Sequence, residues 1–280
     1  MTRGLSLLSR RGAAVLGAAI LLLVAVLAVA GPSLSRHDPL KMNPGEALSP
    51  PSAAHPFGTD QYGRDVWSRV VAGARLSLAT GLGAVVIALT AGLGLGLVSG
   101  AAGGWTDLLA MRVVDVMMAF PSVLMALVVV AILGQGSTNV MVAVGVSLVP
   151  TFVRLIRGNV LVVREHAYVE AARALGCQPG RVTLRHILPN IIAPVIVLAT
   201  IAIAWSIIIG ASLSFLGLGP RPPRPEWGID LSNGRNYLLR AWWISGGPGI
   251  AIMTTVVAVN LVGDSLRDVL DPRMRSLTNL

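Results

Sequence analysis

The stretch EAARALGCQPGRVTLRHILP, residues 170–189, carries most of the information about the fold, because it is a charged segment between two long apolar runs. Its pattern predicts two short amphipathic helices that are broken at Gly176. Glycine readily adopts the left-handed conformation that stops a helix, and Pro179 suits the first turn of the next one. We call residues 170–189 the elbow and expect it to be a compact docking element on one face of a membrane.

Charged and apolar positions of the elbow fall on different sides. Glu170 precedes Arg173 by three positions, so we expect the two side chains to pair, and Arg181 and Arg185 lie four apart on the second helix. The apolar positions at helical spacing are Tyr168, Ala171, Ala172 and Leu175 on the first helix, and Leu184, Ile187 and Leu188 on the second.

The elbow resembles the EAA loop of permease subunits from binding-protein-dependent ABC importers. The residues that match its pattern are Glu170, Ala171, Ala172, Gly176, Leu188 and Pro189, whereas His186 stands where the pattern has isoleucine. Segments at 57–69, 73–78, 112–121, 225–228 and 263–272 are similar to the peptide and nickel branch, and within it to the "C" permease subunit of dipeptide or oligopeptide systems. The resemblance implies that the elbow inserts into a cleft on a separate ATPase subunit, with Arg173 and Arg185 as charged contacts.

The same resemblance implies a complex with several partners. This chain would pair with a homologous second permease, two ATPase subunits or domains would bind ATP and Mg²⁺, and an extracytoplasmic binding protein would deliver the substrate. The chain would translocate di- or oligopeptides by alternating access, and would itself hold no cofactor and no metal. Nickel complexes and other small solutes are alternative substrates, and the two ATPases could be separate chains or fused to each other.

Composition indicates an integral membrane protein and argues against an enzyme. Hydrophobic residues make up 54% of the chain and charged residues 12%, with uncharged runs long enough to cross a bilayer. The only lysine, Lys41, is not in a Gly-Lys-Ser/Thr loop, so ATP hydrolysis by a Walker A site is excluded. Scattered histidines and the lack of a G-x-S-x-G turn predict no catalytic residues. The single Cys177 excludes an internal disulfide, and no basic patch with interleaved aromatics suggests nucleic acid.

The apolar runs predict an all-α protein with six transmembrane helices, the elbow lying in a cytoplasmic loop between the fourth and the fifth. The spans are expected at about residues 13–34, 76–101, 113–133, 140–156, 190–216 and 248–270. Residues 28–30 mimic a signal-peptidase site, but the apolar run is longer than a signal core, which favours a retained anchor. Pro121, Pro150 and Pro194 should bend their helices.

We expect two regions. Residues 1–72 would hold the anchor helix, an outer loop and an amphipathic helix at residues 60–74 that lies in the interface, capped by Thr59 or Asp60. Residues 73–280 would form a five-helix permease core, with a coupling loop at about 161–189. We expect the chain to lie in the inner membrane of a bacterium, with both termini in the cytoplasm. In this orientation the inner segments carry modestly more basic residues than the outer ones do.

Three further features carry expectations about helix packing, ion pairing and contact with a partner. A ridge of small residues at four-residue steps, Ala84, Ala88, Gly92, Gly96 and Gly100, predicts close helix packing, either within the chain or against a partner. Arg112 and Asp115 are expected to pair on one helix face. By resemblance, an outer proline-rich arm would contact the binding protein through Pro222, Pro223, Arg224 and Trp227.

Other classes of protein fit less well. An ion-coupled secondary transporter is the alternative, but it usually needs more spans and ionisable groups at mid-membrane. An intramembrane protease would need a second aspartate facing Asp264, and a simple membrane anchor would not need the elbow.

Overall fold

The computed structural model describes residues 2–270, and within them every regular element is a helix. Five helices are long and apolar enough to cross a membrane, or six if a bent pair is counted as one span, which confirms the predicted class. The helices are α1 (Thr2–Leu34), α2 (Val66–Ala102), α3 (Gly104–Met118), α4 (Ser122–Leu133), α5 (Ser137–Val163), α6 (Ala167–Ala174), α7 (Pro179–Val182), α8 (Leu188–Phe215), α9 (Trp227–Gly234) and α10 (Trp243–Leu270).

The predicted third span is a broken pair rather than one helix. α3 and α4 meet at 94°, and Pro121 lies between them as the residue before α4. Proline cannot donate a backbone hydrogen bond and disfavours helical geometry in the residue before it. The chain therefore turns at this point, more sharply than the bend that we expected.

The interfacial helix expected at residues 60–74 is not a separate element. α2 begins at Val66 and runs without interruption to Ala102, so the boundary expected after residue 72 falls inside one helix. Thr59 and Asp60 were wrong as caps. The cap is Asp65, whose carboxylate accepts a hydrogen bond from the backbone N–H of Ser68 at 2.8 Å.

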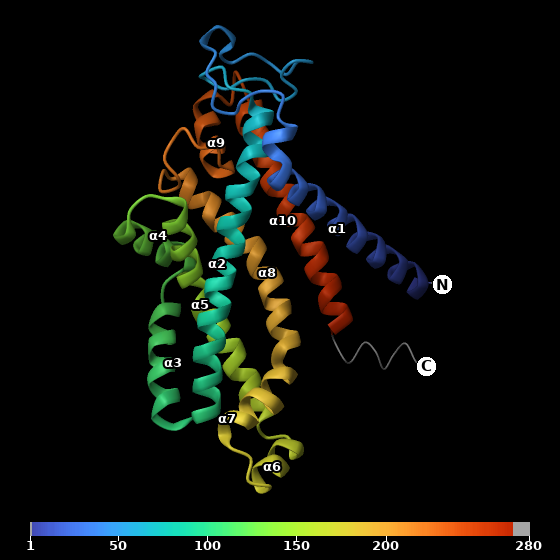
Figure 1. Cartoon of the computed structure of the whole chain (residues 1–280), viewed down its shortest axis with the longest axis vertical. Helices are drawn as coiled ribbons and strands as arrows, with labels where there is room; N and C mark the ends of the chain where they lie inside the picture. The colour runs from blue at the N-terminus through green and yellow to red at the C-terminus, as the bar shows by residue number, and fades with distance from the viewer. Residues whose placement is uncertain (1, 271–280) are drawn as a thin grey trace.

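α2, α5 and α8 form the centre of the molecule, and α1 lies beside α10 (Figure 1). The small-residue ridge of α2 faces α5 of the same chain. A Cβ built on Gly96 would lie 2.8 Å from the Cβ of Ile156, and one on Gly100 would lie 2.8 Å from the Cβ of Val160. These positions therefore allow the two backbones to approach closely, within the chain.

The elbow lies at one end of the molecule, where α6 and α7 project beyond the long helices (Figure 1). The loop between α1 and α2 lies at the opposite end, together with α9. The described part of α10 ends at Leu270 and points toward the elbow end. The last two residues of the segment 263–272, which carried part of the family resemblance, lie outside the described residues.

Candidate functional site

The first half of the elbow ends in a turn built around Gly176. After α6, the N–H of Gly176 donates to the carbonyl oxygen of Arg173 at 2.9 Å, and the N–H of Cys177 donates to that of Ala172 at 3.1 Å. These two bonds define a Schellman cap, which needs the left-handed residue that Gly176 supplies at φ +80°. Nothing lies within 4 Å of a Cβ built on Gly176, so its conformation alone calls for glycine.

The second half of the elbow begins at Pro179, as expected, and runs without a break into α8. Pro179 opens α7, with Gln178 as the residue before the helix. The chain then passes through a π-helical turn, Thr183–Ile187, straight into α8. The N–H of Leu188 reaches back five residues to the carbonyl oxygen of Thr183. This wider turn lets the helix continue past Pro189, which has no N–H to donate.

Most of the predicted coupling residues are at the surface. Ala172 is buried and Leu188 is half-buried; the exposed ones are Glu170, Ala171, Arg173, Gly176, Arg185 and Pro189. In the part of the chain that the structure describes, Glu170 and Arg173 do not form the expected ion pair. Two large apolar side chains project beside them, Leu175 with 85% and Leu184 with 62% of its surface exposed. The elbow thus presents charges and apolar groups together.

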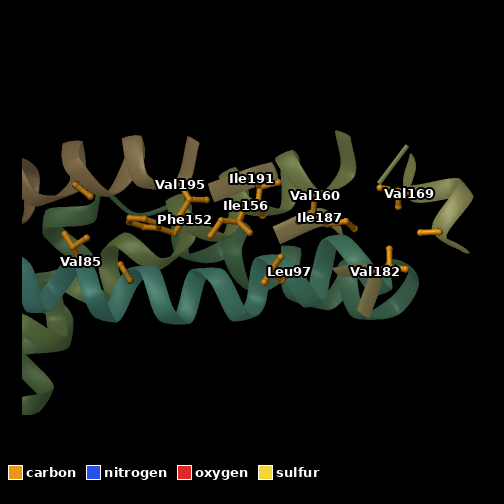
Figure 2. Close-up of a cluster of buried hydrophobic side chains, with 13 residues drawn as sticks. Val85, Leu97, Phe152, Ile156, Val160, Val169, Val182, Ile187, Ile191 and Val195 are labelled. Atoms are coloured by element: carbon orange, nitrogen blue, oxygen red, sulfur yellow. The ribbon is translucent and has the colours of Figure 1, made fainter. Parts of the chain in front are cut away.

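The elbow is fixed to the long helices by buried aliphatic side chains. Val169, Val182 and Ile187 are nearly inaccessible and belong to one continuous cluster with Ile156 and Phe152 of α5. Figure 2 shows this row running from Val169 and Val182 at the elbow toward Val85 in α2. Val169 and Val182 were not among the predicted residues, although the three-residue spacing of Val169 and Ala172 was a signal for the buried face.

Ion pairs connect α3 to α5 near the elbow. The carboxylate of Asp107 accepts from Nη2 of Arg157 at 2.6 Å and also from the hydroxyl of Ser99 in α2. The expected pair of Arg112 with Asp115 was wrong, because Asp115 instead pairs with Arg154 of α5 at 2.7 Å. A guanidinium on the neighbouring helix reaches this carboxylate, and helical spacing alone could not reveal it.

An apolar groove of about 500 Å³ runs between the elbow end of α2 and the elbow itself. Its walls include Leu97, Val98 and Ala101 from α2, and Cys177, Pro179 and Leu184 from the elbow. The lining is mostly hydrocarbon, which suits protein or lipid contact rather than acid–base chemistry.

Two segments that carried the family resemblance meet at the opposite end of the molecule. Nε of Arg69 donates to Asp230 at 3.0 Å, and Nε1 of Trp227 donates to the carbonyl oxygen of Val70 at 2.8 Å. Trp227 is only 2% exposed, so its expected contact with a binding protein was wrong; Pro222, Pro223 and Arg224 are exposed.

The acidic groups beside Trp227 are buried. The Glu226 carboxylate caps α9 by accepting from the N–H groups of Gly228 and Ile229, both at 3.0 Å. Burial nevertheless raises the pKa of Glu226, and burial likewise raises the pKa of Asp230 although Arg69 opposes that effect.

Two family models match different parts of the chain. Residues 92–276 match the model of the binding-protein-dependent transport system inner membrane component, and residues 5–51 match the N-terminal TM domain of oligopeptide transport permease C. The dipeptide transport system permease protein DppC of Alkalihalophilus pseudofirmus is 44% identical, over 96% of this chain and 88% of that protein. The probable D,D-dipeptide transport system permease protein DdpC of Escherichia coli is 43% identical, over 92% and 87%. The glutathione transport system permease protein GsiD of Pectobacterium atrosepticum is 46% identical, over 81% and 75%.

Proposed function

This chain belongs to the family of binding-protein-dependent transport system inner membrane components, and we propose that it forms half of the path through which an ATP-driven importer moves di- or oligopeptides. It is a permease subunit of an importer complex and an integral membrane protein. The relatives support peptides as the substrate, because their names specify dipeptides, D,D-dipeptides and glutathione.

The partners in this proposal supply what the chain does not. A homologous second permease completes the path, and an extracytoplasmic binding protein delivers the peptide. Two ATPase subunits or domains bind ATP and Mg²⁺ and drive the cycle, so this chain hydrolyses nothing itself. In this proposal the proline-rich arm contacts the binding protein through Pro222, Pro223 and Arg224, and their exposure supports that role.

The elbow is the single observation that carries the proposal. Its exposed side, with Glu170, Arg173 and Leu175, suits a contact with another protein, because charged and apolar groups are available together. Its other side is anchored by Val169 and Ile187 in the cluster that reaches along α5. A push on the exposed side is therefore delivered to packed helices rather than absorbed by a loose loop.

The cycle that follows is alternating access. ATP binding closes the two ATPases, the elbow moves with them, and the long helices change from inward-facing to outward-facing. Such coupling requires that the position of the elbow and the helix arrangement influence each other's free energy. In this proposal the elbow and both chain termini lie in the cytoplasm.

Photocrosslinking tests the contact directly. A photoreactive amino acid at Leu175 in the assembled importer should form adducts with an ATPase subunit, because this side chain projects into solvent. The same probe at Leu239, which is also exposed but lies between α9 and α10 in the chain, should form none with the ATPase. Adducts with the ATPase from Leu239 and none from Leu175 would refute the docking model.

Transport measurements test the substrate and the energy source. Uptake of a labelled dipeptide should require this chain and should stop when ATP is depleted. Uptake that survives ATP depletion but is abolished by an uncoupler would instead identify an ion-coupled transporter.

A further inference from the structure

Two histidines and a carboxylate meet in the loop between α1 and α2, at the end of the molecule opposite the elbow (Figure 1). One nitrogen of His37, one of His55 and one carboxylate oxygen of Asp65 all lie within 4.8 Å of one another. We propose that these three side chains bind a divalent transition-metal ion, with Zn²⁺ the best fit. The ion would tie the segment after α1 to the first residue before α2, and this proposal stands independently of transport.

His55 is held between two carboxylates. Its Nδ1 lies 2.9 Å from Oδ1 of Asp65, and its Nε2 lies 3.3 Å from Oε2 of Glu46. When the neutral ring donates from Nε2 to Glu46, the lone pair of Nδ1 points at an oxygen of Asp65 that can only accept. In that tautomer a metal ion between Nδ1 and Oδ1 would bind both lone pairs, whereas the other tautomer donates from Nδ1 to Asp65. The 2.9 Å separation is slightly below the roughly 3.3 Å between two tetrahedral ligands at zinc bond lengths.

The ligand atoms are oriented by hydrogen bonds on their far sides. Oδ2 of Asp65 accepts from the N–H of Ser68 at 2.8 Å and from its hydroxyl at 2.6 Å, which leaves Oδ1 for the ion. Asn43 donates to Oε2 of Glu46 at 2.9 Å and so fixes the carboxylate that faces His55. Histidine and carboxylate ligands of metal ions are commonly positioned in this way.

His37 provides the adjustable side of the site. Its ring lies 4.6 Å from that of His55, with the ring planes tilted by 32°, and its side chain is exposed. An ion can therefore enter from the side of His37 while His55 and Asp65 stay in place. Two imidazoles and one carboxylate suit Zn²⁺ with a water in the fourth position, whereas Ca²⁺ and Mg²⁺ prefer oxygen ligands throughout.

Zinc titration of the purified full-length chain tests the site. The protein carries a purification tag without histidine, and Zn²⁺ is titrated against a chromogenic chelator. We expect each chain to bind one zinc ion with high affinity. The zinc affinity should be at least about tenfold lower in His37→Ala and in His55→Ala, and about tenfold lower in Glu46→Gln. His166→Ala and His186→Ala are matched controls near the elbow and should bind as the wild type does.

A spectroscopic measurement separates coordination from folding. Co²⁺ in place of Zn²⁺ should give the visible absorption of a tetrahedral site in the wild type and lose it in His55→Ala. Asp65→Asn keeps an oxygen for the Ser68 cap but removes the anionic ligand, so it should weaken zinc binding at an unchanged unfolding temperature. If the wild type binds no zinc, or if both histidine variants bind it equally well, the proposal is wrong and the contact of His55 with Asp65 is only a hydrogen bond.

Discussion

The backbone N–H of Cys177 donates to the carbonyl oxygen of Ala172 at 3.1 Å, so the chain closes on itself around Gly176. This bond keeps α6 at a fixed angle to α7. The elbow therefore has a defined shape before any partner binds, and its effect on transport should depend on that shape.

Replacing Gly176 with valine should separate ATP hydrolysis from uptake. A β-branched residue at φ +80° costs at least about 1–2 kcal/mol, and the turn should open to avoid this cost. ATPase activity and peptide uptake are measured on the same reconstituted complex. Gly180→Val is the matched control, because Gly180 lies on the same elbow in open space without a positive φ. Normal uptake by an assembled Gly176→Val complex would contradict the prediction.

Substitutions of Ile187 and of Leu184 should impair different properties of the protein. Ile187 is 1% exposed, and Ile187→Ala should lower the stability of the chain by about 2–5 kcal/mol because it leaves a cavity. Leu184 is 62% exposed, and Leu184→Ala should leave the unfolding temperature unchanged while it weakens binding of the ATPase. Thermal unfolding in detergent and co-purification of the ATPase distinguish the two effects. Equal loss of stability in both variants would rule out the division into an anchored and a docking side.

The close approach of α2 and α5 predicts a contrast between two nearby glycines. Gly96→Ala would place a Cβ 2.8 Å from the Cβ of Ile156 and should cost about 1–3 kcal/mol through overpacking. Gly94→Ala, two residues earlier, would meet nothing within 4 Å and should be neutral. The unfolding temperatures of the two variants, measured side by side, decide the matter, and similar values for both would argue against the packing.

The ion pair of Arg69 with Asp230 should matter more than that of Arg154 with Asp115. The first pair is buried, and Arg69→Met would leave a buried carboxylate without its cation, at a cost of about 3–5 kcal/mol. The second pair is half exposed, so Arg154→Met should cost about 0–1 kcal/mol. The unfolding temperature of each variant tests this ranking, and a larger effect from Arg154→Met would reverse it.

Glu226 predicts a dependence of stability on pH. Burial raises the pKa of its carboxyl above the ordinary value of 4.5, so the folded state binds the proton more tightly than the unfolded state does. The contribution of this group is therefore most favourable below pH 4.5 and declines as the pH rises through the folded pKa. Glu226→Gln keeps an oxygen that can cap α9 and removes the titration. Unfolding temperatures of the two proteins should diverge as the pH rises above 4.5, with the variant higher; parallel curves would exclude this role.

Local chemistry explains which parts of the elbow the sequence predicts well. The left-handed turn at Gly176 and the helix start at Pro179 depend on the conformations of those residues themselves, and both were predicted. The π turn before Pro189 was not predicted, although it lets the helix continue through a proline that has no N–H to donate. Single-residue propensity does not indicate when neighbouring residues will adjust in this way.

Long-range contacts explain what the sequence could not provide. Arg69 and Asp230 are 161 residues apart, and no spacing rule connects them. Trp227 looked like part of an exposed arm because it follows several prolines, yet it is buried against α2. Residues on one helix can be compared by periodicity, but burial of a loop depends on which distant helix covers it.

The π turn also sets the direction in which the elbow points. One additional residue rotates everything before it by about 100° around the axis of α8. A single deletion within Thr183–Ile187 would swing Leu175 and Glu170 to another side of the bundle while keeping their chemistry intact. The direction in which the elbow extends from the bundle therefore depends on one additional residue in the π turn.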